Sequence, residues 1–207
     1  MSLDYEKQFY NESIKYIAGC DEAGRGCLLG PVVAAAVILP KDFSSDLIND
    51  SKKLSEKKRE EAFELIKNSA IAYAIGVVEA DTIDEINIYE ASRRAMLEAL
   101  TNLNHQIDFV ITDAMPLPGS GYSHEAVIKG DSKALCVAAA SIVAKVSRDH
   151  MMYDLDKAFP KYKIAKHKGY GTKAHLEALK KYGPIEHIHR KTYGPVAECY
   201  IEKIKLF

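Results

Sequence analysis

Hydrophobic positions along the chain fall into short apolar runs and longer segments with a helical repeat. Five apolar runs predict β-strands: residues 16–22, 31–39, 71–80, 108–115 and, as the shortest, 125–131. Two long amphipathic segments, 81–103 and 132–159, predict helices, and the second is dense in small residues that would pack closely on a sheet. A further helix is expected after Ser55, which is a suitable N-cap. This order of elements predicts an α/β fold.

The pattern changes after Pro160, where basic and aromatic residues replace the small apolar ones. Residues 161–194 contain nine Lys or Arg against two acids, although the whole chain has a net charge of −1. A basic segment with interleaved tyrosines can attract phosphates, and it can equally be a solvated lysine-rich surface. We therefore predict a catalytic core at 1–158 and a basic helical region at 159–207 that packs on it.

Composition places the chain among globular proteins. Its 207 residues are 47% apolar and 28% charged, as expected of a single soluble domain with an appendage. The N-terminus lacks the apolar core of a signal peptide, and the apolar run at 27–39 is too short to cross a bilayer. None of the four cysteines forms a C-x-x-C pair. We expect reduced thiols in a cytoplasmic, monomeric protein without a membrane partner.

One predicted strand carries two adjacent carboxylates. In "GCDEAGRGCLLGPVVAAAVI" (19–38), Asp21 and Glu22 interrupt a run of small and apolar residues. Buried carboxylates are costly and neighbouring ones repel each other, so a partner must neutralise them. Consecutive residues of a regular strand point to opposite faces, so the two would converge only where the strand ends or kinks. The glycines that follow would give the backbone this freedom.

Two further aspartates stand at the ends of predicted elements. Asp113 closes a hydrophobic strand, and Asp131 follows Gly130 at the start of the long helix. Acids in these places can meet at one edge of a sheet, and oxygen ligands without His or Cys suit Mg²⁺ or Mn²⁺. Each residue alone has a simpler interpretation: Asp131 or Ser132 could be a helix N-cap, Asp113 a turn residue and Arg25 an ion-pair partner.

Six blocks in order carry a resemblance that runs from about residue 15 to residue 200. They are "DEAGRG" (21–26), "NDSKKLSEKKRE" (49–60), "ITDAM" (111–115), "KGDSKALCVAAASIVAKVSRD" (129–149), "HKGYGTKAH" (167–175) and "HRKTYGPV" (189–196). Together they resemble the ribonuclease HII family, the type 2 ribonucleases H. The resemblance implies a ribonuclease H-like mixed β-sheet flanked by helices, with a helical C-terminal appendage.

The resemblance also implies an activity and its cofactor. Members of the family cut the RNA strand of RNA–DNA hybrids and cut at single ribonucleotides in duplex DNA, leaving 3′-hydroxyl and 5′-phosphate ends. The family's four metal-binding acids correspond to Asp21, Glu22, Asp113 and Asp131. Two Mg²⁺ or Mn²⁺ ions held there with substrate would align the attacking and leaving oxygens.

Substrate recognition is implied at a second group of residues. In the family, the backbone of a Gly-Arg-Gly segment, here Gly24, Arg25 and Gly26, holds the 2′-hydroxyl that distinguishes RNA from DNA. A tyrosine, here Tyr170, stacks on the neighbouring sugar, although Tyr170 could also fill the core. Further phosphate contacts are expected from Lys52 and Lys53 in a loop, and from Ser141, Lys145 and Arg148 at i, i+4 and i+7 of the long helix.

Two other functions fit parts of the sequence. A catalytically silent nucleic-acid-binding module could share the fold, but binding alone gains nothing from four carboxylates beside phosphate. A phosphohydrolase of small nucleotides would not need the basic C-terminal segment, and the chain has no G-x-x-x-x-G-K-[ST] loop. The ending "YIEKIKLF" could dock on a sliding clamp or form a packed terminal helix.

Overall fold

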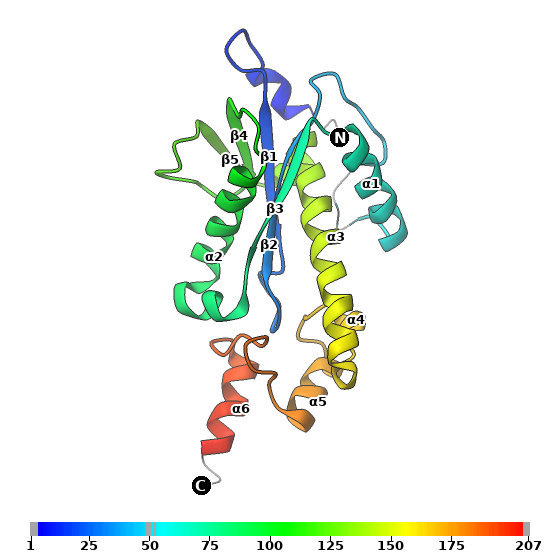
Figure 1. Cartoon of the computed structure of the whole chain (residues 1–207), viewed down its shortest axis with the longest axis vertical. Coiled ribbons are helices and arrows are strands. Elements are labelled where there is room, and N and C mark those ends of the chain that lie inside the picture. Colours follow the sequence, from blue (N-terminus) through cyan, green and yellow to red (C-terminus); the bar gives the residue numbers. More distant parts are fainter. Residues whose placement is uncertain (1–3, 49–50, 52, 205–207) are drawn as a thin grey trace.

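The computed structural model describes residues 4–48, 51 and 53–204, which fold around one mixed β-sheet (Figure 1). Its strands are β1 (Ile17–Ala23), β2 (Val32–Ile38), β3 (Ala72–Val78), β4 (Phe109–Asp113) and β5 (His124–Val127). They lie in the order β3-β2-β1-β4-β5. β2 runs antiparallel to β1 and β3, whereas β4 runs parallel to β1 and β5.

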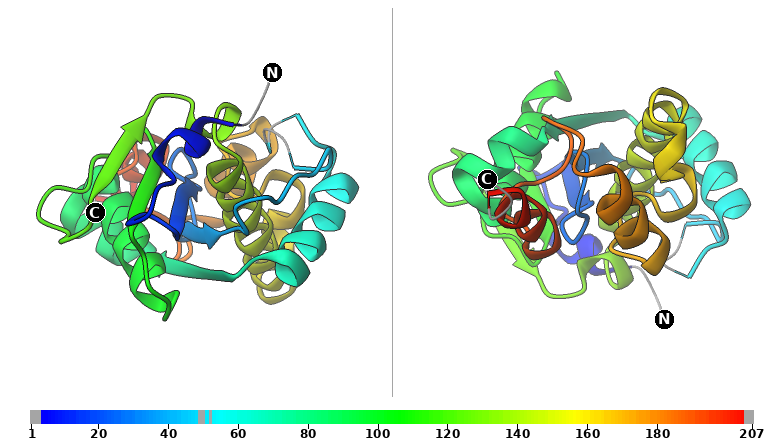
Figure 2. Two further views of the ribbon diagram at one scale, coloured as in Figure 1. Left: turned by 90° about the horizontal axis from the view of Figure 1, so that it is seen from above. Right: turned by 90° about the horizontal axis from the view of Figure 1, so that it is seen from below.

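Helices cover both faces of the sheet. The α-helices are α1 (Glu56–Ser69), α2 (Ala80–Asn102), α3 (Leu135–Ala158), α4 (Ile164–His167), α5 (Lys173–Tyr182) and α6 (Gly194–Ile204), and the 3₁₀ helices are η1 (Tyr5–Phe9), η2 (Gly130–Ser132) and η3 (Pro160–Tyr162). Seen from either end, α2 lies on one face and α1 and α3 lie on the other (Figure 2). This confirms the predicted mixed sheet flanked by helices.

The side chains of β1 alternate between the two layers. Ala18 and Cys20 belong to the cluster that packs on α2, and Ile17 belongs to the cluster around the start of α3. Gly19 faces α3 so closely that a Cβ atom there would lie 2.2 Å from the carbonyl carbon of Cys136. The small residues of α3 thus bring the helix directly onto β1, as the sequence predicts.

Most predicted elements are confirmed, and two helices differ. The helix predicted for 81–103 is interrupted at Asn87, whose backbone is not helical (φ 68°, ψ 164°). The long helix starts at Leu135 and not near 132, because 130–132 form a separate 3₁₀ turn. Neither Asp131 nor Ser132 is its N-cap, which is Ala134. The Ser55 cap is confirmed: its side chain accepts a hydrogen bond from the backbone N–H of Lys58.

The cap of α3 comes from a segment that the sequence did not assign to any element. Glu6, on η1, is buried, and its carboxylate accepts hydrogen bonds from the N–H groups of Leu135 (2.9 Å) and Cys136 (3.0 Å). A carboxylate suits the positive end of a helix and satisfies N–H groups that have no partner within it. The N-terminal segment therefore fixes where α3 starts.

The C-terminal region after α3 packs against the segment that follows β1. Isolated β-bridges join Cys27 to Tyr170 and Leu29 to His189. The loop before α6 is also tied to α2, because the Asp84 carboxylate accepts from the backbone N–H groups of Lys191 (2.7 Å) and Thr192 (3.0 Å). The division at residues 158 and 159 stays a prediction. Among the described residues, no helix is long and apolar enough to cross a membrane.

Candidate active site

Three of the predicted acids meet beside the end of β1. One carboxylate oxygen each from Asp21, Asp113 and Asp131 lies within 4.8 Å of the other two. Asp21 comes from β1, Asp113 ends the parallel strand β4, and Asp131 lies in η2. Because β1 and β4 are parallel neighbours, their carboxyl ends reach the same edge of the sheet.

A tight connection brings Asp131 back to Asp113. The Asp113 carboxylate accepts a hydrogen bond from the N–H of Gly130 (2.8 Å). Lys129 adopts a left-handed conformation (φ 58°), which turns the chain from β5 into η2. A Cβ at position 130 would lie 3.3 Å from the carbonyl oxygen of Thr112, so glycine allows this close approach.

Asp21 and Glu22 do not converge through a kink, which corrects the expectation from the sequence. The ladder between β1 and β2 continues through Ala23, so both acids lie inside a regular strand. Asp21 shares the α3 face with Gly19, and Glu22 points to the other face. Glu22 lies outside the group of three aspartates and forms an ion pair with Arg25 (3.1 Å). Its role as a fourth metal ligand stays a prediction.

Burial and mutual repulsion raise the pKa of the two adjacent acids on β1. The pKa of Asp21 is raised well above its ordinary value by burial, then by the nearby charges of Glu22 and Asp113, while hydrogen bonding with Ser141 opposes the shift. Burial also raises the pKa of Glu22, although Arg25 lowers it. A site that resists negative charge in this way favours a bound cation.

The Gly-Arg-Gly turn directly continues β1. Gly24 is buried with a φ of 99°, a conformation that glycine adopts easily, whereas Arg25 and Gly26 are exposed. The N–H groups of Arg25 and Gly26 meet no acceptor within the described part of the chain. The turn therefore presents two backbone donors to solvent beside the carboxylates.

Three predicted substrate residues lie near this turn. Tyr170 is 44% exposed, so it is not core filler, and the Lys145 Nζ lies 6.0 Å from the centre of its ring. Lys145 also forms an ion pair with Asp149 (2.6 Å). Ser141 is buried one helical turn earlier, where its hydroxyl is hydrogen-bonded to that of Ser51 (2.8 Å). Ser141 thus faces the aspartates rather than an open phosphate surface.

One predicted substrate residue in this region does not fit the structure. Arg148 was expected at the helix surface as a phosphate contact, but it is 1% exposed, and its guanidinium donates to backbone carbonyls. Nearby, His189 is also buried, and it is hydrogen-bonded to His175 (3.2 Å between the Nε2 atoms). His187 is exposed and pairs with Asp81 (2.6 Å).

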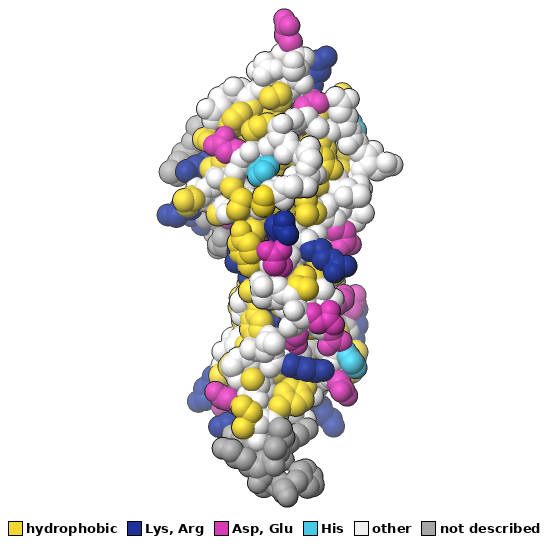
Figure 3. Space-filling model, turned by 90° about the vertical axis from the view of Figure 1, so that its left-hand side faces the viewer, with side chains coloured by type: hydrophobic (Ala, Val, Ile, Leu, Met, Phe, Trp, Pro, Cys, Tyr) yellow, Lys and Arg dark blue, Asp and Glu magenta, His cyan; other side chains and the backbone are white. Residues whose placement is uncertain are grey.

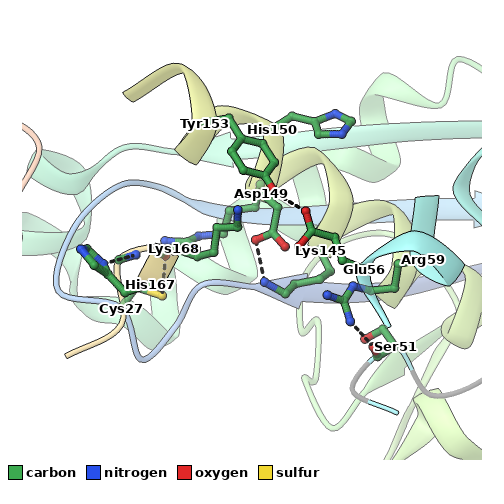
Figure 4. Close-up of polar contacts among 12 residues, drawn as sticks. Cys27, Ser51, Glu56, Arg59, Lys145, Asp149, His150, Tyr153, His167 and Lys168 are labelled. Atoms are coloured by element: carbon green, nitrogen blue, oxygen red, sulfur yellow. Dashed lines mark hydrogen bonds and ion pairs between the residues drawn. The ribbon is translucent and has the colours of Figure 1, made fainter. Parts of the chain in front are cut away.

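Figure 4 shows polar residues on α3, α1 and the C-terminal region that the sequence did not single out. The Lys168 Nζ lies 3.3 Å from the ring centre of Tyr153, whose hydroxyl is hydrogen-bonded to Glu56. Tyr153 and Asp149 follow Lys145 at intervals of four residues, the spacing of one helix face. From this spacing, the sequence could have indicated that Asp149 and Tyr153 share a helix face with Lys145.

Most basic side chains of the 161–194 segment lie at the surface. Six lysines of the 161–194 segment are exposed: Lys161, Lys163, Lys166, Lys173, Lys180 and Lys181. Lys53 is exposed in the loop before α1, and Lys52 lies outside the described residues. On the face shown in Figure 3, basic and acidic side chains are interspersed among the described residues.

Comparisons with known proteins agree with this geometry. A family model described as Ribonuclease HII matches residues 18–195. The Ribonuclease HII of Caldanaerobacter subterraneus is 53% identical over 189 residues, covering 91% of this chain and 78% of that protein. The crystal structure of the ribonuclease H2 from Pyrococcus horikoshii OT3 superposes with a TM-score of 0.77 at 26% identity, covering 92% of this chain and 99% of that one.

A second solved structure is an assembly. It is the PCNA:RNase HII complex from Archaeoglobus fulgidus, which matches with a TM-score of 0.72 at 27% identity over 86% of this chain and 96% of that one.

The fold, the aspartate cluster and these similarities define a ribonuclease H, a divalent-metal-dependent endonuclease and phosphodiester hydrolase. The chain belongs to the ribonuclease HII family.

Proposed function

We propose that this protein cuts the RNA strand of RNA–DNA hybrids and also cuts at single ribonucleotides embedded in duplex DNA. The observation that carries the proposal is the direct continuation of β1 from Asp21 into the exposed turn of Arg25 and Gly26. Two backbone donors without acceptors in the described chain stand next to three clustered aspartates. A ribose 2′-hydroxyl can accept from such donors, and it is the group that distinguishes RNA from DNA.

The donor set of the site fits hard divalent cations. The three clustered side chains offer only carboxylate oxygens, the ligands that Mg²⁺ and Mn²⁺ prefer over those of softer metals. Asp21, Asp113 and Asp131 would hold the metal, with Glu22 as a further ligand. Two bound ions would generate the attacking hydroxide and stabilise the leaving 3′ oxygen, giving 3′-hydroxyl and 5′-phosphate ends.

The residues around the aspartates would orient the nucleic acid. Tyr170 is exposed next to Lys145, so its ring can lie against a sugar while the ammonium group approaches a phosphate. Lys53, and Lys52 as a prediction from the sequence, would contact the nucleic-acid backbone from the loop before α1. Ser141 would keep Asp21 in place by hydrogen bonding.

Partners and location belong to the same proposal. The clamp complex of the Archaeoglobus relative supports docking of the C-terminal Leu206-Phe207 on a sliding clamp, a segment outside the described residues. The cysteines are free thiols, which supports a cytoplasmic location. The monomeric state predicted from the sequence stays a prediction.

The test is a cleavage assay with three end-labelled duplexes in Mg²⁺ or Mn²⁺. One contains a single ribonucleotide, one has a continuous RNA strand, and one is all DNA. We expect cuts in the first two, none in the third, and none in any with a chelator. If only the continuous hybrid is cut, the protein is still a ribonuclease H, but the turn has no role in recognising a single ribonucleotide. If neither RNA-containing duplex is cut, the silent binding module becomes the better account.

A further inference from the structure

Two arginines are buried in the protein without a carboxylate partner among the described residues. Arg148, on α3, is 1% exposed, and Arg190, in the loop before α6, is 0% exposed. Burial lowers the pKa of Arg190, which reflects the cost of removing a guanidinium group from water. A buried charge is seldom a source of stability, so its presence suggests that the shape it imposes is needed.

The two guanidinium groups hold backbone carbonyls of one segment, residues 25–31. Arg190 donates to the carbonyl of Gly30 from Nε (3.0 Å) and Nη2 (2.9 Å), and to that of Arg25 from Nη1 (2.9 Å). Arg148 donates to the carbonyls of Leu29 (3.1 Å) and Pro31 (3.0 Å). Four of the seven carbonyls in this irregular segment are therefore fixed by arginine side chains.

The direction of these bonds decides what the turn presents to substrate. With the Arg25 carbonyl bonded to Arg190, the N–H groups of Arg25 and Gly26 remain without an acceptor in the described chain, and both residues are exposed. Tyr193 reinforces the arrangement, because its hydroxyl donates to the same Arg25 carbonyl (2.7 Å) and accepts from Arg190 (3.0 Å).

The same arginines connect the turn to the C-terminal region. Arg148 donates a third bond to the carbonyl of Lys168 (2.8 Å), two residues before Tyr170. The backbone N–H of Arg190 donates to the carbonyl of Leu28 (2.9 Å). Arg148 also lies directly under the turn, since a Cβ atom on Gly24 would come within 2.1 Å of its Nε atom.

We propose that Arg148 and Arg190 are positioning residues for ribonucleotide selection: they fix the carbonyls of residues 25–31 so that the Gly-Arg-Gly donors and Tyr170 keep one relative geometry. This inference rests on the proposed function. It assigns the C-terminal region a part in selectivity, because one of the two arginines belongs to that region and the other is bonded to it. Within the described residues, the two guanidinium groups donate to backbone carbonyls and to the Tyr193 hydroxyl.

The test uses Arg190→Lys, with Arg94→Lys as the matched control at an exposed position on α2. Lysine keeps the positive charge but cannot bind several carbonyls in one plane. Initial rates are measured on the single-ribonucleotide duplex and on the continuous hybrid. We expect the single-ribonucleotide rate to fall about 10- to 100-fold relative to the hybrid rate, the scale of a small misplacement of substrate-binding groups. Arg94→Lys should leave the ratio unchanged.

A second readout separates positioning from general destabilisation. In an Asp21→Asn background, which is expected not to cut, Arg190→Lys should abolish the preference for binding a ribonucleotide-containing duplex over all-DNA duplex. The rise in melting temperature on adding Mn²⁺ to Arg190→Lys alone should match the wild type. Arg148→Lys provides a second variant should Arg190→Lys fail to fold.

The outcomes distinguish the inference from the function on which it rests. If the wild type does not cut at a single ribonucleotide, the proposed function fails before any variant is compared. If the wild type cuts there and folded Arg190→Lys loses both activities equally, the arginine is merely structural and the inference is overturned. An unchanged ratio in both folded arginine variants would overturn it as well.

Discussion

The aspartate cluster and the Gly-Arg-Gly turn are neighbours in the chain, but they are built in opposite ways. Asp21 and Asp113 lie on paired strands, whose backbone hydrogen bonds fix their positions. The turn lies outside the sheet, has a positive φ at Gly24, and is held by side chains from α3 and the C-terminal region. Under the proposed function, the chemical step would therefore depend on the sheet, and substrate selection would depend on contacts between distant parts of the chain.

This difference predicts that the two functions can be separated by mutation. Changes in the aspartates should abolish cutting on every substrate while leaving the fold intact. Changes in the turn or its supports should alter the choice of substrate or the stability.

Replacing Asp21 or Asp113 with Asn should abolish cleavage. The expected loss is at least about 10³-fold in kcat, or about 4 kcal/mol of transition-state stabilisation, because a metal ligand is removed. Duplex binding should change little. The melting temperature of metal-free Asp21→Asn should rise or stay level, since the change removes repulsion with Glu22 and Asp113. Full activity in both variants would contradict the metal site, and a marked fall in melting temperature would indicate a structural acid.

Gly24→Ala and Gly26→Ala form a matched pair within the turn. A Cβ at position 24 would meet Arg148 and would force a side chain into φ 99°, whereas a Cβ at position 26 meets nothing within 4 Å. Gly24→Ala should therefore lose about 1–3 kcal/mol of unfolding free energy, and Gly26→Ala almost none. Chemical denaturation measures both.

The two glycine variants should differ on substrate as well. Gly26→Ala places a methyl group where a ribose would approach, so cutting at a single ribonucleotide should fall although the protein is stable. Equal stability of the two variants would show that the turn is not held as described.

The packing of the C-terminal region should weaken in acid. Burial lowers the pKa of His175 and of His189 to about 4, so the folded protein resists protonation that the unfolded chain accepts near its ordinary pKa of 6.5. The unfolded state therefore binds more protons between these values, and stability should fall as the pH drops from about 6.5 toward 4. Melting temperatures across this range should show it, and His189→Asn should flatten the slope. The exposed His105→Asn is the control, and an identical slope in His189→Asn would contradict the assignment.

Tyr193→Phe should give the smallest effect. It removes the hydroxyl that shares the Arg25 carbonyl with Arg190, and the ring stays in place. We expect a loss of about 1 kcal/mol or less, with a slight drop in cutting at a single ribonucleotide. A loss as large as that of Gly24→Ala would mean that the tyrosine, and not the arginine, holds the turn.

The parts that the sequence predicted well are those with a local signal. The apolar runs predicted the strands of the sheet. The acids in and beside these runs predicted that Asp21, Asp113 and Asp131 would meet at one edge of it. The predicted start of α3 was wrong because the carboxylate that accepts from its first N–H groups belongs to Glu6, more than a hundred residues away in the chain. Nothing in local spacing reveals such a partner.

Arg148 illustrates the same limit. Its spacing from Ser141 and Lys145 placed it on a helix face, and an arginine on a helix face is usually exposed. Here the C-terminal region covers it, so its guanidinium bonds to carbonyls of the chain. Helical periodicity predicts which residues share a face but not what packs on that face.

The most direct test of the account compares wild type with Asp21→Asn on a duplex that contains one ribonucleotide, in Mg²⁺ or Mn²⁺, with cleavage and binding measured on the same samples. The account predicts that the wild type cuts at the ribonucleotide, and that Asp21→Asn binds the duplex with similar affinity without cutting it. Cutting by Asp21→Asn at the wild-type rate would contradict the assignment of the chemical step to the aspartates beside the end of β1.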